Sequence, residues 1–151
     1  MILNYVFAVA AMGIAFMLSV WSLGGLLRGY VDSVCLLITV VFPLIYQWAL
    51  FGFRALKNAF TAGFRKDVSL EDLDQARLFF KSYAKVVWFS ALSLVIIGMV
   101  AMLRYLEDRS ALGPNMAMTL LSILYAAMLQ IIVFIPFSVI LNRRINESAE
   151  V

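Results

Sequence analysis

The uncharged stretch from Leu112 to Pro136 is mostly apolar, but it carries polar side chains at regular intervals. At 100° per residue, four of these positions fall within an arc of about 80° on one face of a helix. They are Asn115, Thr119, Ser122 and Gln130. Hydroxyl and amide groups can hydrogen-bond to water, to an ion or to a neighbouring helix. Because an unpaired amide is costly in hydrocarbon, this face must meet protein or a wet cavity.

Other reactive chemistry is scarce in the sequence. Histidine is absent, which removes the commonest general base and metal ligand, and Cys35 is the single cysteine. We find no nucleophile–base pair, no metal-ligand cluster and no phosphate-binding glycine loop. We therefore expect a protein that is not an enzyme and that needs no cofactor or metal.

The elements that position these groups are expected to be membrane helices. Hydrophobic residues make up 64% of the 151 residues and the mean hydropathy is +0.97, whereas soluble domains run at about 45–50% apolar residues. Four stretches without charge, 1–27, 33–53, 86–103 and 110–142, approach or exceed the roughly 20 residues that a spanning helix needs. The fold class predicted is an all-α, polytopic membrane protein with four transmembrane helices.

The four spans are placed near 4–26, 32–53, 84–105 and 114–140. The first could be read as a signal peptide, but it has no early Lys or Arg and is too long. We therefore expect a retained helix and a single membrane domain over 1–151.

The basic residues predict the orientation of these helices. Seven lie between the second and third helices: Arg54, Lys57, Arg65, Lys66, Arg77, Lys81 and Lys85. The two connections on the opposite side hold three: Arg28, Arg104 and Arg109. By the positive-inside rule, the helical segment 54–83, the tail 141–151 and both termini are cytoplasmic. The net charge of +3 is explained by this rule and does not indicate a nucleic-acid partner.

The cytoplasmic segment is predicted to be helical. Phenylalanine and leucine recur at helical spacing after residue 53, so helix two should run out of the bilayer and break at Gly63. Ser69 and Asp72 resemble a capping start, and helix three should then run from near Leu70 to about Asp108. Pro114 is expected to open helix four, which also emerges from the membrane at its far end.

Small or polar stripes are predicted on two other helices as well. Helix three carries Ser82, Ser90, Ser93 and Ala101, and helix one carries Ala8, Ala15, Ser19 and Ser22. Such stripes let helices pack closely and hydrogen-bond across the contact, which is the simplest explanation. No ionisable side chain lies deep in any predicted span, so a titrating group for ion movement must come from a partner.

The stretch "LGPNMAMTLLSILYAAMLQIIVFIP" (112–136) resembles the last membrane helix of the MotA/TolQ/ExbB proton-channel family, especially its MotA branch. "IIGMVAML" (96–103) resembles the end of the preceding family helix, and "GGLLRGYVDSVCLLI" (24–38) the entry to helix two. The resemblance implies a bacterial inner-membrane protein that forms a ring of five subunits. The ring surrounds a pair of single-span MotB/ExbD/TolR-type helices whose aspartate carries the proton, and the complex is a motor driven by proton motive force.

The resemblance also implies which residues line the ion pathway. The polar faces of helices three and four would look into the ring. The pore-lining residues would be Ser93, Thr119, Ser122, Tyr125, Gln130 and Pro136.

The chain departs from the family pattern in several places. Ser122 and Ile123 stand where the family has paired threonines, Ala126 replaces a glycine, and Val95 replaces the helix-three threonine. MotA proteins carry a large cytoplasmic domain where this chain has about 30 residues. The chain would thus be a compact, divergent member without the usual flagellar torque role.

Two other readings stay open at this point. One is a structural scaffold that keeps the fold but does not conduct. The other is an unrelated four-helix transporter of small molecules, although such a protein usually places a charge within a span.

Overall fold

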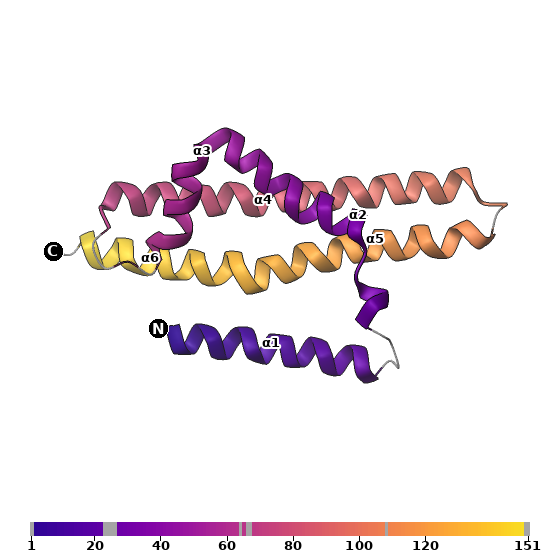
Figure 1. Cartoon of the computed structure of the whole chain (residues 1–151), viewed down its shortest axis with the longest axis horizontal. Helices are drawn as coiled ribbons and strands as arrows, with labels where there is room; N and C mark the ends of the chain where they lie inside the picture. Colours follow the sequence, from indigo (N-terminus) through magenta and orange to yellow (C-terminus); the bar gives the residue numbers. More distant parts are fainter. Residues whose placement is uncertain (1, 23–26, 64, 66–67, 108, 150–151) are drawn as a thin grey trace. The chain divides into compact units, whose positions relative to one another are not determined.

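The computed structural model describes residues 2–22, 27–63, 65, 68–107 and 109–149. Every regular element assigned over these residues is a helix (Figure 1). The chain divides into two units, 1–33 and 34–151, and each is described by itself. The predicted all-α class is confirmed.

The first unit contains α1 (Ile2–Ser22) and the short 3-10 helix η1 (Leu27–Tyr30). The Phe16 and Tyr30 rings meet edge to face with centroids 6.1 Å apart. Ser19 Oγ donates to Ala15 O at 2.8 Å, and Ser22 Oγ donates to Ser19 O at 3.0 Å. These hydroxyls are therefore satisfied within their own helix. The last residues of the predicted first span, 23–26, lie outside the described residues.

The second unit begins with one long helix that contains a wide turn. Its parts are α2 (Ser33–Leu36), the π-helical turn η2 (Leu37–Val41) and α3 (Phe42–Ala62). At the turn, the Phe42 N–H bonds to Leu37 O, five residues back. Pro43 follows directly, and a proline lacks the N–H and crowds the carbonyl four residues earlier. The helix accommodates this proline by widening for one turn.

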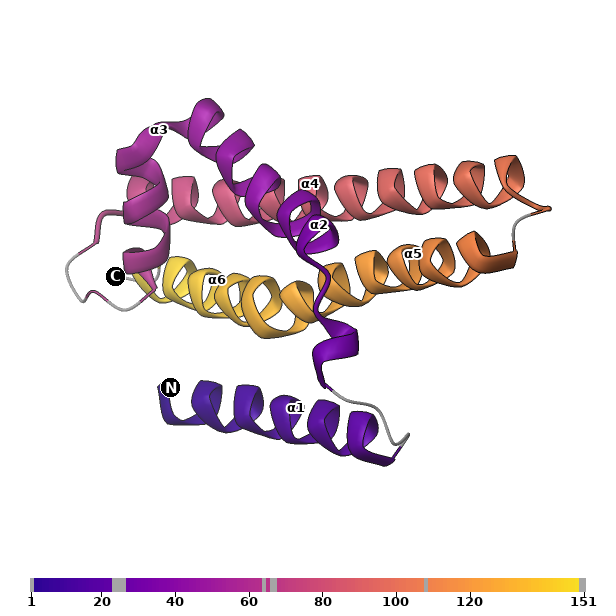
Figure 2. The same ribbon diagram turned by 45° about the vertical axis from the view of Figure 1, so that its right-hand side comes forward.

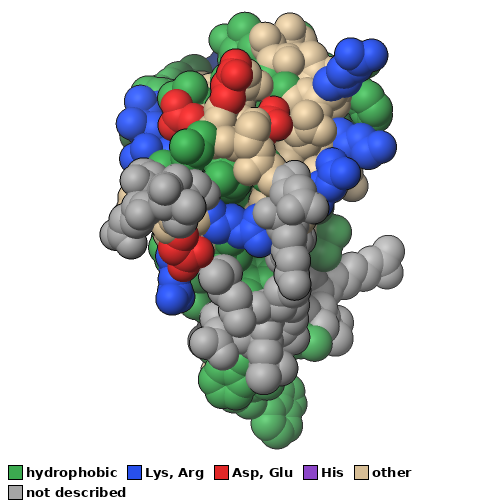
Figure 3. Space-filling model, turned by 90° about the vertical axis from the view of Figure 1, so that its left-hand side faces the viewer, with side chains coloured by type: hydrophobic (Ala, Val, Ile, Leu, Met, Phe, Trp, Pro, Cys, Tyr) green, Lys and Arg blue, Asp and Glu red, His purple; other side chains and the backbone are tan. Residues whose placement is uncertain are grey.

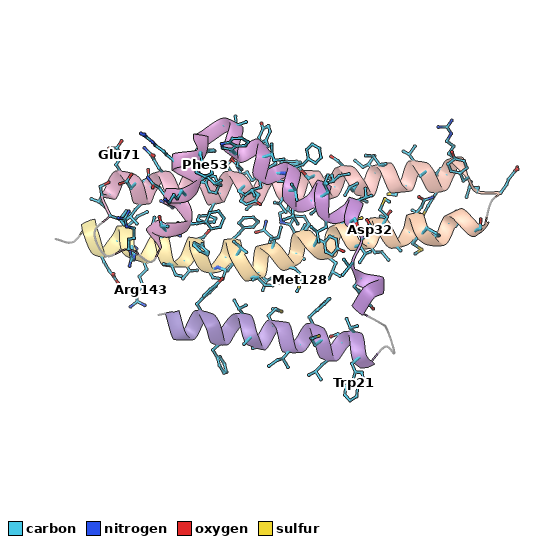
Figure 4. The ribbon with its side chains drawn as sticks, viewed as in Figure 1. Trp21, Asp32, Phe53, Glu71, Met128 and Arg143 are labelled. Carbon is cyan, nitrogen blue, oxygen red and sulfur yellow. The ribbon has the colours of Figure 1, made fainter. Side chains whose placement is uncertain are left out.

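The helix α3 bends sharply at Gly52, where φ is +80° and ψ is 162°. Beyond the bend, α3 crosses α4 towards α6 (Figures 2 and 4), and Phe53, directly after the bend, has 65% of its surface exposed. α3 ends at Ala62 with Gly63 as its C-cap, which confirms the predicted break. The bend itself was not predicted.

The longest element is α4 (Leu70–Arg104), with 35 residues, so it spans about 52 Å at 1.5 Å per residue. The Asp72 N–H donates to Ser69 Oγ at 3.2 Å, and Ser69 Oγ donates to Asp72 Oδ2 at 2.8 Å. This confirms the predicted capping start. The helix ends at Arg104, slightly before the predicted end at Asp108.

The last helix runs antiparallel to α4 over most of its length (Figures 1 and 2). It consists of α5 (Arg109–Leu129), a second π-helical turn η3 (Gln130–Phe134) and α6 (Ile135–Ala149). The wide turn η3 again lies just before a proline, Pro136. The prediction that Pro114 opens this helix was wrong, because α5 begins at Arg109 and contains Pro114. Pro114 is the sixth residue of α5, where a proline cannot donate the helical hydrogen bond to the residue four positions earlier.

Three helices among the described residues are long and apolar enough to cross a membrane: Ser33–Ala62, Leu70–Arg104 and Leu112–Glu147. A shorter apolar helix covers Val9–Ser22. The chain is thus a polytopic α-helical membrane protein. In each long helix 22% of the apolar window is buried within the chain, so most of its surface is left to lipid or to other chains.

The hydrophobic core lies towards the end where α4 begins and α6 ends. Aromatic side chains from α3, α4, η3 and α6 dominate it, and we call them the aromatic core: Phe60, Phe79, Phe80, Tyr83, Phe134 and Phe137. The Phe80 and Phe137 rings stack with centroids 4.7 Å apart, and Tyr83 meets Phe134 edge to face at 4.9 Å.

Arg144 closes this end of the second unit. Its Nη1 donates to Ala62 O at 3.0 Å and also to Arg65 O. These carbonyls lie at the end of α3, where backbone acceptors have no partner within the helix. One guanidinium of α6 therefore ties down the C-terminus of α3.

Candidate functional site

The polar face predicted on the last helix packs directly against small residues of α4. We call this contact the seam, and it comprises Ala84, Ala91 and Gly98 of α4 with Thr119, Ser122 and Gln130 of α5 and η3. Gln130 Nε2 donates to Ala84 O at 3.2 Å. Ser122 Oγ lies 2.8 Å from Thr119 O and 3.4 Å from Ala91 O.

The closest approach in the seam is between Gly98 and Thr119. Thr119 Oγ1 donates to Asn115 O at 2.8 Å. A Cβ added at Gly98 would overlap Thr119 Oγ1 and would lie 3.4 Å from Asn115 O. Gly98 is therefore needed for close packing, and the two helices could not approach this closely with any larger residue there.

Seven-residue spacing on α4 explains why one face supplies all three small residues. Ala84, Ala91 and Gly98 lie two turns apart from one another, so they stay on one side of the helix. Interhelical hydrogen bonds in membranes contribute only about 0.6 kcal/mol each on average.

A second group of polar contacts joins η2 and α3 to this hairpin. Gln47 Nε2 donates to Ser82 Oγ at 3.0 Å, and the Tyr83 hydroxyl donates to Val40 O at 3.3 Å. Two buried oxygens in this region, Thr39 Oγ1 and Gln47 Oε1, have no hydrogen-bond partner among the described residues. Both side chains are fully buried, so these two oxygens have given up hydrogen bonds to solvent without gaining one among the described residues.

Sequence reasoning did not single out Thr39 or Gln47. A signal was present, since both interrupt the uncharged stretch 33–53, and Pro43 between them marks a disturbed helix. Wide turns of the π type are frequent at functional sites. Thr39 lies within such a turn, η2.

The structure places the residues predicted to line a pathway in different surroundings. Ser122 is fully buried, and Thr119 is 8% exposed. Gln130, Tyr125 and Pro136 are half-buried. The seam thus brings together Thr119, Ser122 and Gln130 inside a single chain.

Ser93 lies apart from the seam. It is exposed, and its hydroxyl donates to Phe89 O within α4 at 2.8 Å. Among the pathway residues predicted on α4 and α5, Ser93 is the one whose side chain faces outward from the chain.

The groups assembled here can bind and orient but do not titrate. Hydroxyls, amides and backbone carbonyls accept or donate hydrogen bonds without changing charge near neutral pH. The described residues include no cluster of three or more His, Cys, Asp or Glu that could hold a metal. Any proton that moves past these groups must be carried by water or by a group from another chain.

Two known proteins match about half of this chain. Motility protein A of Borreliella burgdorferi is 38% identical over 72 residues, which are 48% of this chain and 28% of that protein. Chemotaxis protein PomA of Vibrio alginolyticus is 35% identical over 79 residues, which are 51% of this chain and 31% of that protein. The matched half of the chain is MotA-like in sequence. No family model matches it.

The MotA-like match has a defined extent. The chain spans less than a third of the length of each of the two relatives. The three long apolar helices are those of a multi-pass membrane protein. The hairpin of α4 and α5 is the part of the chain in which the polar groups concentrate.

Proposed function

We propose that this chain is a ring-forming subunit of a membrane motor or ion channel driven by proton motive force. The observation that carries the proposal is the similarity to both Motility protein A and PomA. The subunit would form a homopentamer in a bacterial inner membrane. It would work with a single-span MotB-, ExbD- or TolR-like partner whose aspartate carries the proton.

The chemistry of the seam supports a partner of this kind. The uncharged stretches 86–103 and 110–142 contain no Asp, Glu, Lys or Arg. Proton movement through a membrane usually needs a titratable group at that depth. The chain therefore supplies a packed, polar surround, and the partner would supply the acid.

Among the proposed pathway residues, Ser93 is the best placed to meet a partner helix directly, because it is exposed. Ser122 and Thr119 are covered by α4 in the single chain. They could contribute to an ion pathway if α4 and α5 separated, or indirectly through the backbone carbonyls to which their hydroxyls donate. Tyr125, Gln130 and Pro136 would border the same path at intermediate exposure.

The orientation proposed for the ring follows from charge. The segment 54–83 and the tail 141–151 would lie in the cytoplasm, as would both ends of the sequence. Fusions of a fluorescent protein and of alkaline phosphatase at each end test this: fluorescence without phosphatase activity is expected at both.

The function is tested by co-expressing the chain with a single-span partner that carries a membrane aspartate. We expect the pair to co-purify, native mass spectrometry to count five copies of this chain, and reconstituted vesicles to take up protons. Replacing the partner's aspartate by asparagine should stop the uptake. Ser93→Ala should reduce the flux, while Ser93→Thr, which keeps the hydroxyl, should retain most of it. A purified monomer that neither binds a partner nor passes protons would refute the proposal.

A structural scaffold without conduction is the second candidate. It is favoured by the fact that Ser122 and Thr119 already donate to carbonyls within the chain, which leaves these hydroxyls occupied. Proton uptake by the same reconstituted vesicles distinguishes the scaffold from the conducting subunit. A stable complex with the partner and no proton uptake would support the scaffold, whereas an uptake that depends on the partner would exclude it.

A further inference from the structure

A groove of about 450 Å³ lies between α4 and the η3–α6 segment, and it borders the end of the seam at Ala84 and Gln130. The α4 side of the groove is basic, with Arg77, Lys81 and Lys85 at four-residue spacing. Four residues of helix rise about 6 Å, so these cations line one wall at successive turns. The opposite wall offers the polar groups of Ser138 and Asn142.

The positive charge of this groove is poorly compensated. The described residues that line it include no Asp or Glu. Arg77 Nη1 lies 4.0 Å from Asp74 Oδ1, but both side chains are largely exposed, so this pair is weak. Lys81 and Lys85 form no salt bridge with any described residue. Figure 3 shows basic side chains along one edge of this end of the molecule, with no acidic side chain among them.

The depth of the groove relative to the membrane follows from the sequence. Lys85 is the last charged residue before the uncharged stretch 86–103, so it marks the edge of the hydrocarbon. From Lys85 to Arg77 the helix rises about 12 Å, whereas the headgroup layer of one leaflet is only about 5–8 Å thick. The groove therefore crosses the whole layer in which lipid phosphates lie.

The groove is also bordered by apolar side chains. Ile135 and Val139 of α6 line it and are 55% and 60% exposed. Phe80 and Phe134 of the aromatic core form part of its lining. A ligand that fits must therefore bring negative charge for one wall and hydrocarbon for the other.

We propose that this groove binds the phosphate groups of an anionic phospholipid. Basic pockets between membrane helices on the cytoplasmic side are suited to such headgroups. Three cations over about 12 Å suit a lipid with two phosphodiesters better than a lipid with one. Ser138 and Asn142 would donate to phosphate or glycerol oxygens, and an acyl chain would lie along Ile135 and Val139. The inference needs the chain to lie in a membrane, but it does not depend on the proposed motor function.

The test uses the full chain purified in a neutral detergent, with retained lipid counted by native mass spectrometry. The probes are diphosphatidylglycerol, phosphatidylglycerol, phosphatidylcholine and inorganic pyrophosphate. We expect retention in that order for the lipids, and little binding of pyrophosphate. Because each basic side chain near the surface contributes about a fivefold gain in affinity, Lys81→Gln with Lys85→Gln should weaken diphosphatidylglycerol binding about 25-fold.

The matched control is Arg54→Gln with Lys57→Gln, which removes the same charge from α3 outside the groove. The control should retain lipid to within about twofold of the unsubstituted chain. Circular dichroism should show that both double variants are folded. Equal losses of lipid retention in both double variants would mean that the overall positive charge of the protein, and not the groove, holds the lipid. That result would overturn the proposed site. Pyrophosphate binding as tight as lipid binding would also overturn it, as would a groove variant that changed the mass of the oligomer and left lipid retention intact.

Discussion

Replacing Gly98 by alanine tests whether the seam is as close as the structure indicates. The new Cβ would overlap Thr119 Oγ1, and overpacking of this kind costs about 1–3 kcal/mol. Alanine gains about 1 kcal/mol over glycine in helix propensity. The net expectation is a loss of about 1 kcal/mol in the free energy of unfolding, measured by SDS titration in mixed micelles with far-UV circular dichroism.

A double-mutant cycle with Thr119 isolates the cause. Thr119→Ala removes the atom that is overlapped, and the next neighbours of the added Cβ lie 3.4 Å away, which is tolerable. In that background Gly98→Ala should stabilise the protein, with a coupling energy of about 1–3 kcal/mol between the two sites. Thr119→Val removes the hydroxyl but keeps its volume, so Gly98→Ala should still destabilise there.

Gly13→Ala in α1 is the matched control, because nothing lies within 4 Å of a Cβ built there. It should leave the unfolding curve of the second unit unchanged. If Gly98→Ala raised stability with Thr119 present, and the cycle showed no coupling, the helices would not pack through this pair and the seam would be wrong.

Three further variants test other parts of the second unit by the same unfolding titration. Arg144→Ala should destabilise by about 1–3 kcal/mol, because it leaves the carbonyls at the end of α3 without their charged donor; Arg143→Ala, which breaks only an exposed pair with Glu147, should cost about 0.5 kcal/mol or less. Gly52→Ala should cost about 1–2 kcal/mol, because its φ of +80° disfavours any side chain. Gln47→Leu should stay within about 1 kcal/mol of the parent, because it removes one hydrogen bond and one unpaired buried oxygen together.

Each of these expectations has an opposite outcome that would count against its cause. Equal effects at Arg144 and Arg143 would mean that the contact with α3 contributes nothing. A neutral Gly52→Ala would mean that α3 runs straight in solution. A loss of more than about 2 kcal/mol in Gln47→Leu would mean that Oε1 has a partner and is not free.

Local signals in the sequence were sufficient to predict several helix boundaries, although not the start of α5, which lies before Pro114. The cap at Ser69, the break at Gly63 and the long uninterrupted α4 all follow from residue types and the absence of glycine and proline. The two wide turns could have been inferred from Pro43 and Pro136, since each lies just before one of these prolines.

Long-range contacts could not be predicted in the same way. The bend at Gly52 depends on what α3 packs against after it leaves the membrane helix. The aromatic core joins residues of α3, α4 and α6 that are far apart in sequence, and no period within one helix reveals it. No sequence pattern indicates that Arg144 contacts α3, whereas in the structure it donates to Ala62 O at the end of that helix.

The candidate site shows the same division. Helical periodicity placed Thr119, Ser122 and Gln130 on one face, because that needs only 100° per residue. It could not decide whether the face meets α4 or another chain, because the period of one helix does not identify the neighbour of a face. In the structure Ser122 and Gln130 donate to α4 carbonyls, and the role of these residues in an ion pathway stays a prediction.

The seven-residue spacing of Ala84, Ala91 and Gly98 affects how hairpins of this kind would be shaped within an assembly. An ideal α-helix does not repeat after seven residues, so a stripe with that period drifts around the axis and makes two helices coil in a left-handed sense. In the proposed ring, every hairpin would carry the same left-handed coil. The surface facing the centre would therefore be handed, and clockwise and anticlockwise displacement of anything turning there would meet it differently.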